Sequence, residues 1–192
     1  ILTLIALVSG TALGSVYQIT KDPIAKANEA AIAAAKSEVF AEAKSFEAYA
    51  DFDEKAANKA VSAFGYTDGS VTSCEIKECD CALNADGEVL GYVVSVISHA
   101  GYGGDIEFLV GVTKDGVLNG YSITTINETA GLGMKATESK FSDQFMNIEG
   151  ATSNLLEVVK SSDDDPSTIE AISGATITSK AMTYGVDAAL FY

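Results

Sequence analysis

Small and hydroxyl-bearing residues gather in one short segment, where residues 173–176 read Ser-Gly-Ala-Thr and further hydroxyls follow at Thr178 and Ser179. Small side chains let another molecule approach the backbone, and unpaired N–H groups at the start of a helix attract phosphate. The same residue types also cap helices for purely structural reasons. The residues alone therefore indicate either a phosphate-binding helix start or an ordinary helix cap.

A second segment suited to ligand chemistry is the glycine-rich loop at residues 127–134, which reads Asn-Glu-Thr-Ala-Gly-Leu-Gly-Met. It follows a run of predicted strands and precedes a predicted helix. These two loops hold the residues that we expect to carry the chemistry of the chain.

The charged residues limit how a ligand can be held. The 192 residues have a net charge of -15, all 12 cationic side chains are lysines, and arginine and tryptophan are absent. An acidic chain without arginine is a poor candidate for nucleic-acid binding, and no guanidinium fork is available for a phosphate. An anionic ligand must be held by backbone N–H groups, hydroxyls, lysines or a covalent bond.

The three cysteines have the spacing Cys74-x4-Cys79-x-Cys81. A tetrahedral metal site needs four ligands, and His99 is the only histidine that could complete one. Strand alternation predicts Cys79 and Cys81 on one face and Cys74 on the other. Small strand residues are favoured over a disulfide with one thiol left over, or a metal site, and we predict no metal. Residues 163–165, three aspartates, read as a solvated linker, with a weak cation site as the alternative.

The N-terminal part of the chain is expected to be helical. Residues 1–20 contain no charge and at ~1.5 Å per residue span about 30 Å, so they predict a transmembrane helix. A cleaved signal peptide is the alternative. Residues 21–50, rich in Ala, Lys and Glu with Pro23 in the first turn, predict a stalk helix.

The rest of the chain, residues 51–192, is expected to form one domain. Branched and aromatic residues between Gly and Asp turns predict strands over 71–83, 88–98, 106–113 and 117–125. Helices are predicted near 137–145 and 180–192, with a polar linker at 161–166. The predicted fold class is α+β, an antiparallel sheet with packed helices.

The Ser-Gly-Ala-Thr segment, followed by x-Thr-Ser and a terminal helix, resembles the flavinylation motif of the FMN-binding domain family. That family includes the G subunit of the Rnf electron-transport complex and the C subunit of the sodium-pumping NADH:quinone oxidoreductase. Glu-Thr-Ala-Gly-Leu-Gly at residues 128–133 is similar to a second hallmark of the family, Glu-Thr-Pro-Gly-Leu-Gly. The resemblance covers essentially the whole chain, whose length is closer to that of the Rnf protein.

The resemblance implies that Thr176 carries FMN through a phosphoester bond, placed there by a flavin transferase. It implies backbone neighbours of the attachment point at Ser173, Gly174 and Ala175, and a phosphate hydrogen-bond donor at Thr178. The residues expected to flank the isoalloxazine ring, with Leu132 against a ring face, are Glu128, Thr129, Gly131, Leu132 and Gly133.

Two positions depart from the family pattern. Ala130 replaces the usual proline, so the loop loses a fixed backbone angle and its bound shape is expected to be less preformed. Glu170 stands where aspartate is common, one methylene longer. If this carboxylate helps the transferase, flavinylation is expected to be slower, but the acceptor hydroxyl remains.

The function implied by the resemblance is a membrane-anchored flavoprotein subunit of an Rnf-type ferredoxin:NAD oxidoreductase complex coupled to sodium or proton translocation. The expected partners are other membrane and peripheral Rnf subunits, the flavin transferase and membrane lipid, with a single pass through the cell membrane and an extracytoplasmic flavin domain. Little activity is expected from the chain alone. The alternatives are a stand-alone extracytoplasmic flavin reductase and a non-redox, membrane-tethered binding domain.

Overall fold

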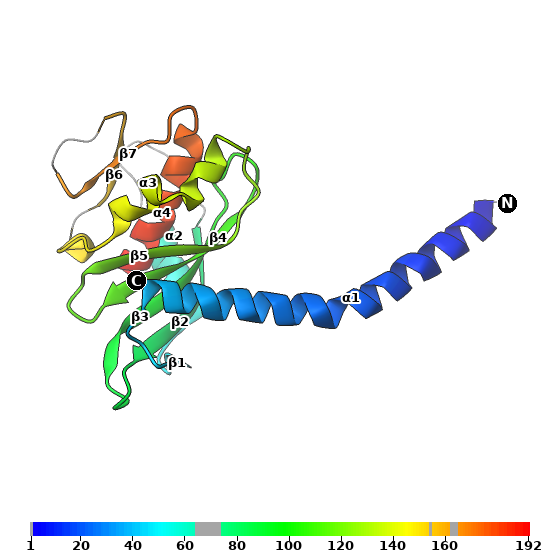
Figure 1. Cartoon of the computed structure of the whole chain (residues 1–192), viewed down its shortest axis with the longest axis horizontal. Coiled ribbons are helices and arrows are strands. Elements are labelled where there is room, and N and C mark those ends of the chain that lie inside the picture. The colour runs from blue at the N-terminus through cyan, green and yellow to red at the C-terminus, as the bar shows by residue number, and fades with distance from the viewer. Residues whose placement is uncertain (1, 64–73, 154, 162–164) are drawn as a thin grey trace. The chain divides into compact units, whose positions relative to one another are not determined.

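The computed structural model describes residues 2–63, 74–153, 155–161 and 165–192. The chain divides into two compact units, residues 1–34 and 35–192, and Figure 1 traces both. The first unit is helical throughout its described length, and the second contains the sheets and all other helices.

Helix α1 comprises Leu2–Val39, with Pro23 inside it, and its last residues belong to the second unit. Within the described part of the chain, no helix is both long enough and apolar enough to cross a membrane. The structure therefore shows the predicted N-terminal helix but does not support its transmembrane character. The helix expected through residue 50 ends at Val39, and part of the remaining segment is a strand.

A five-stranded antiparallel sheet forms the centre of the second unit, with its strands in sequential order. The strands are β1 (Ser45–Ala48), β2 (Cys74–Leu83), β3 (Val89–Ser98), β4 (Ile106–Thr113) and β5 (Leu118–Thr125). The last three confirm the predicted strands to within one residue at each end. The prediction over 71–83 is confirmed from Cys74 onward, and residues 71–73 lie outside the described residues. Gly87 and Gly116, with φ of 79° and 80°, supply the left-handed turns that link β2 to β3 and β4 to β5.

Two of the elements that were not predicted lie between α1 and β2. Strand β1 pairs antiparallel with β2, and helix α2 (Glu54–Ala63) contacts the same strand. Asn58 of α2 accepts a hydrogen bond from the Ile76 N–H and donates one to the Ile76 carbonyl, at 2.8 and 3.0 Å. These contacts join the segment after α1 to the edge of the sheet.

Helix α4 (Thr176–Phe191) packs against β2, β3 and β4 on one face of the sheet (Figure 1). Gly185 allows this close approach, because a Cβ atom there would overlap the ring of the buried Phe108 and lie 3.3 Å from Val96. The helix begins at Thr176, four residues before the predicted start. The core between helix and sheet thus sets the position of the Ser-Gly-Ala-Thr segment.

Short elements connect β5 to α4. They are the 3-10 helices η1 (Gly133–Thr137), η2 (Asp143–Phe145) and η3 (Ala151–Ser153), the α-helical turn α3 (Ser139–Ser142), and the parallel strands β6 (Glu157–Val159) and β7 (Thr168–Glu170). The helix predicted over 137–145 is therefore a series of short turns. Of the aspartate cluster predicted as a linker, residues 163 and 164 lie outside the described residues.

The opposite face of the sheet is covered by the end of α1. Val39 and Phe40 are buried against it, next to Gly91 and Gly111, where any side chain would press on the Phe40 ring. Lys36 forms an ion pair with Asp80 at 2.8 Å, and both side chains are largely shielded from solvent. Residues 35–40 are therefore an integral part of the second unit.

Candidate functional site

A cavity of about 570 Å³ lies at the start of α4. Three segments line it: the β3–β4 loop, the glycine-rich loop after β5, and the Ser-Gly-Ala-Thr segment with the first turn of α4. The lining residues are Tyr102, Glu128, Thr129, Leu132, Gly133, Gly174, Ala175, Thr176, Ile177 and Thr178. The volume is that of a typical small-molecule or cofactor pocket.

The cavity brings together all of the predicted site residues except Ser173 and Gly131. Two of its lining residues, Tyr102 and Ile177, were not predicted. A sequence signal for Tyr102 exists, because it stands among glycines in the turn between two predicted strands. For Ile177 the signal is an apolar residue, 53 % exposed, between two threonines that line the same cavity.

The start of α4 lacks a side-chain cap. Its N-cap residue is Ala175, no side chain among the described residues caps the first turn, and the preceding Gly174 has a φ of 78°. The alternative that Ser-Gly-Ala-Thr is an ordinary helix cap is therefore not supported by its geometry. The unpaired N–H groups of the first turn of α4 and the positive end of the helix dipole would favour an anion bound at this helix start.

The Ser179 side chain stabilises the conformation of the Ser-Gly-Ala-Thr segment. Its hydroxyl, fully buried, accepts a hydrogen bond from the Ile172 N–H at 2.9 Å and donates one to the Ala175 carbonyl at 2.9 Å. One side chain thus connects the residues on both sides of Ser173 and Gly174.

We expect Ser179→Ala to lower the free energy of unfolding by about 1–3 kcal/mol, because the buried Ile172 N–H would lose its partner. Urea unfolding followed by far-UV circular dichroism measures this. The matched control is Ser142→Ala, whose hydroxyl makes only a 3.4 Å hydrogen bond at an exposed position. Equal unfolding midpoints for the two variants would contradict the role of Ser179.

Gly133 forms the junction between the two loops. A Cβ atom on this buried glycine would lie 2.7 Å from Thr178 Oγ1 and 2.7 Å from Glu128 Oε2. The Thr178 side chain is only 1 % exposed and lines the cavity. Its hydroxyl therefore places a polar atom beside the cavity, and any larger residue at position 133 would crowd it.

Hydrogen bonds shape the glycine-rich loop. The N–H groups of Leu132 and Met134 both donate to the Thr129 carbonyl, at 3.1 and 3.2 Å, and Gly131 has a φ of 75°. The loop therefore has a defined turn although Ala130 replaces proline. The other departing residue, Glu170, ends β7 with its side chain exposed, and its backbone pairs with Gln144.

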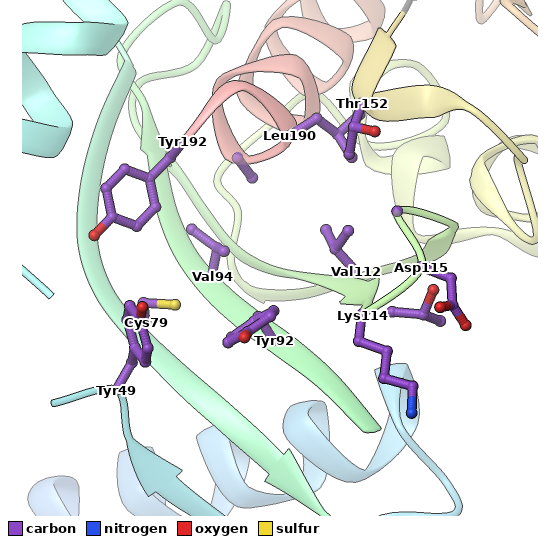
Figure 2. A pocket seen from close by; sticks show the side chains of 13 residues that line it. Tyr49, Cys79, Tyr92, Val94, Val112, Lys114, Asp115, Thr152, Leu190 and Tyr192 are labelled. Carbon is purple, nitrogen blue, oxygen red and sulfur yellow. The ribbon is translucent and has the colours of Figure 1, made fainter. Parts of the chain in front are cut away.

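A second cavity, of about 500 Å³, lies at the other end of α4 (Figure 2). Tyr49, Tyr92 and Tyr192 contribute aromatic rings to its lining, and the rings of Tyr49 and Tyr92 meet edge to face at 5.6 Å. Cys79 also lines it and lies beside Tyr49 in the view of Figure 2. No predicted site residue lines this cavity.

The cysteines differ from the predicted arrangement. Cys74 and Cys79 both pack in the core beneath α4, because a β-bulge between Ile76 and Glu78 shifts the alternation of β2 by one residue. The prediction of Cys74 on the opposite face was therefore wrong. All three cysteines are free, and the described residues contain no cluster of metal-binding side chains.

We expect the buried cysteines to react slowly with iodoacetamide. Burial raises the pKa of Cys74 to about 11 and that of Cys79 to about 12. At pH 8 the reactive thiolate is then about a hundredfold and about a thousandfold scarcer, respectively, than at a thiol with the ordinary pKa of 9.0, and alkylation should accelerate as the pH rises toward 10.

Peptide mass spectrometry after timed alkylation at pH 8 and pH 10 measures these rates. Protein unfolded in urea is the control, since all three thiols should then react alike. Labelling of Cys79 at pH 8 as fast in the folded as in the unfolded protein would contradict the prediction.

Comparison with known proteins gives consistent matches. The family described as FMN-binding domain matches residues 101–190. The chain is 35 % identical to the G subunit of the Na(+)-translocating ferredoxin:NAD(+) oxidoreductase complex of Acetobacterium woodii, over 97 % of this chain and 86 % of the relative. It is 43 % identical to the G subunit of the proton-translocating ferredoxin:NAD(+) oxidoreductase complex of Clostridium ljungdahlii, over 57 % of this chain and 56 % of that relative.

Among solved structures, the crystal structure of Shewanella oneidensis NqrC is similar, with a TM-score of 0.52 and 18 % sequence identity. The match covers 78 % of this chain and 79 % of NqrC. This likeness shows the shared fold, an α+β domain with an antiparallel sheet.

Proposed function

The chain belongs to the FMN-binding domain family, among the G subunits of Rnf-type ferredoxin:NAD(+) oxidoreductase complexes, and we propose from this premise that Thr176 holds FMN through a phosphoester bond. The observation that carries the proposal is the cavity at the start of α4. Both family motifs contribute to its lining, and Thr176 stands at its edge with an exposed side chain.

The described residues fit a phosphate and a ring system. Gly133 and Gly174 leave space that a Cβ atom would fill, against Thr178 and Leu132 respectively. The uncapped first turn of α4 and the Thr178 hydroxyl offer hydrogen-bond donors to a phosphate. A covalent bond together with these donors replaces the arginine that the chain lacks.

The chain is a flavoprotein subunit of an electron-transfer complex. Bound FMN supplies the redox chemistry, and the protein supplies orientation and electrostatics. Leu132 and Ile177, 41 % and 53 % exposed, offer aliphatic surface to a ring in the cavity. Glu128 fixes the β3–β4 loop by accepting a hydrogen bond from the Tyr102 N–H at 2.8 Å. We propose that the other subunits couple this electron transfer to sodium or proton translocation.

Membrane anchoring through the start of α1 is the remaining part of the proposal. Residues 2–20 contain no charged side chain, and several large apolar side chains of this segment are exposed. Contact of these side chains with membrane lipid would remove them from water. The flavin domain would then lie on the extracytoplasmic side of the cell membrane, where a flavin transferase attaches FMN.

Co-expression of the chain with a flavin transferase, followed by intact-mass spectrometry, tests the central proposal. We expect a mass increase equal to FMN less one water, and a yellow protein that keeps its colour after denaturation. An unmodified mass would overturn the flavin proposal in favour of a non-redox binding domain. Rapid turnover by the isolated flavinylated chain with a diffusible donor would instead favour a stand-alone reductase.

Alkaline carbonate extraction of membranes tests the anchoring separately. We expect the full chain to stay in the pellet and a variant lacking residues 1–20 to be released. Release of both forms would contradict the anchoring while leaving the flavin proposal intact.

A further inference from the structure

Tyr102 lines the cavity at the start of α4 from the β3–β4 loop, outside residues 128–133 and 173–176. Its side chain is 70 % exposed, more than Leu132 or Ile177 in the same cavity. An exposed aromatic ring at the mouth of a cavity offers a large apolar surface at a site where a ligand would cover it.

The backbone of the loop is held closely against the glycine-rich loop. The Tyr102 N–H donates to Glu128 Oε1 at 2.8 Å. A Cβ atom on Gly103 would overlap the carbonyl oxygen of Asn127, and one on Gly101 would lie 3.1 Å from Glu128 Oε1. Only residues without a side chain allow this approach, so the glycines fix where the Tyr102 ring is presented.

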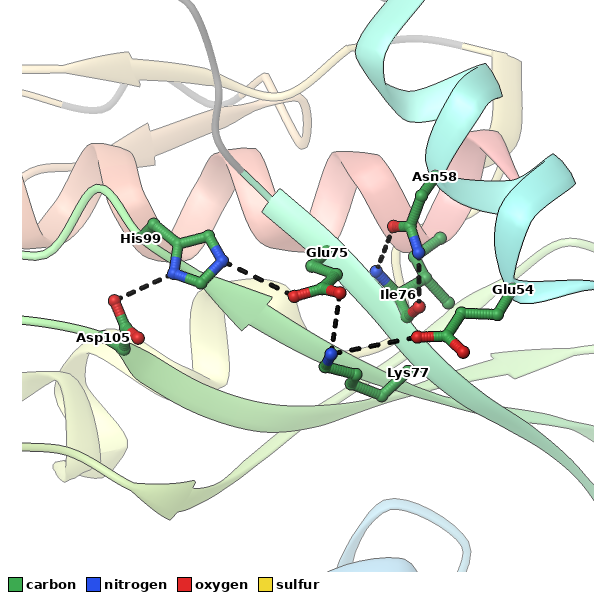
Figure 3. Close-up of polar contacts among 7 residues, drawn as sticks. All are labelled: Glu54, Asn58, Glu75, Ile76, Lys77, His99 and Asp105. Atoms are coloured by element: carbon green, nitrogen blue, oxygen red, sulfur yellow. Dashed lines mark hydrogen bonds and ion pairs between the residues drawn. The ribbon is translucent and has the colours of Figure 1, made fainter.

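A pair of polar side chains closes the base of the same loop. His99 Nδ1 lies 2.9 Å from Asp105 Oδ1, and these residues stand at the two ends of the loop. Figure 3 shows His99 between Asp105 and Glu75, with Lys77 on the far side of Glu75. The β3–β4 loop is therefore held at its two ends by the His99–Asp105 contact and at its centre by the Tyr102–Glu128 hydrogen bond. The backbone, rather than side-chain packing, places Tyr102.

The cavity thus combines aliphatic side chains, from Leu132 and Ile177, with a single aromatic ring among its lining residues. Planar aromatic systems prefer to stack on one another, offset or edge to face. We propose that Tyr102 stacks on the isoalloxazine ring of the FMN held at Thr176 and that the β3–β4 loop is built to present it. This inference depends on the flavin proposal above.

Flavin fluorescence tests the stacking, because a stacked tyrosine quenches the emission of a flavin. The full chain is flavinylated by co-expression, and emission is compared at equal flavin absorbance. We expect Tyr102→Leu to raise the emission severalfold, and Tyr102→Trp, which keeps an electron-rich ring able to stack, to leave it low. Tyr192→Leu is the matched control, since Tyr192 lines the other cavity and should not affect the flavin.

A second variant tests the positioning by the loop. Gly103→Ala keeps the Tyr102 side chain, but the new Cβ atom forces the loop away from Asn127 and displaces the tyrosine ring with it. Emission should therefore rise as in Tyr102→Leu. An FMN adduct whose emission is the same in Tyr102→Leu as in the unsubstituted chain would overturn the stacking alone. Absence of the adduct from the unsubstituted chain would overturn the flavin proposal and the stacking with it.

Discussion

Thr176→Ala is expected to abolish covalent flavin completely, because it removes the only atom of the residue that can form the phosphoester. The folded domain should persist, since the Thr176 side chain is exposed and no side chain in the described part of the chain caps the start of α4. Intact-mass spectrometry after co-expression with a flavin transferase measures the adduct, and far-UV circular dichroism verifies the fold.

Neighbouring hydroxyls provide the controls for this variant. Ser173, exposed and three residues before Thr176, carries another hydroxyl that could accept FMN. Ser173→Ala should retain the adduct, because Thr176 is the proposed acceptor. Thr178→Ala should also retain it, because Thr178 is assigned to hold the phosphate and not to carry it. Covalent flavin on the Thr176→Ala protein would show that another residue is the attachment point.

Gly185→Val is expected to be more destabilising than Ser179→Ala. The new side chain would overlap the Phe108 ring and press on Val96, and both neighbours are fully buried between α4 and the sheet. Overpacking of this kind costs about 3 kcal/mol, or more when the surroundings cannot move. Urea unfolding should show a much lower midpoint, and flavinylation should fall because α4 carries Thr176.

The matched control for this variant is Gly14→Val. Gly14 also lies within a helix, but a Cβ atom there would meet nothing within 4 Å. We expect its unfolding midpoint to stay close to that of the unsubstituted chain. If Gly185→Val unfolded at the same urea concentration as Gly14→Val, the close packing of α4 on Phe108 would not determine stability.

The central strands could be predicted because their sequence pattern is local. Strands β3, β4 and β5 are rich in β-branched and aromatic residues, and turns that contain glycine lie between them. Strand β1 and helix α2 escaped prediction for the opposite reason. The residues of β1 continue the Ala-, Lys- and Glu-containing composition of the preceding helix, and only pairing with β2 makes them a strand.

The start of α4 shows how tertiary packing overrides local preference. Thr176, Ile177 and Thr178 are β-branched and have weak helix propensity, so the pattern alone placed the helix start at residue 180. In the structure Thr178 and Ser179 are buried, and the helix extends back to Thr176. The bulge in β2 is a similar case, since one extra residue moved Cys74 to the other face without any mark in the sequence.

The sequence by itself determined the two segments that matter and the chemistry open to them. Two motifs pointed to Thr176 and to the loop at residues 128–133, and the absence of arginine restricted how a phosphate could be held. Only the tertiary structure decided that these segments, more than forty residues apart, line one cavity, and that Tyr102 joins them. The physical reason is that motifs are local in the chain, whereas a cavity depends on how α4, through Gly185, and the β3–β4 loop, through its glycines, pack against the rest of the fold.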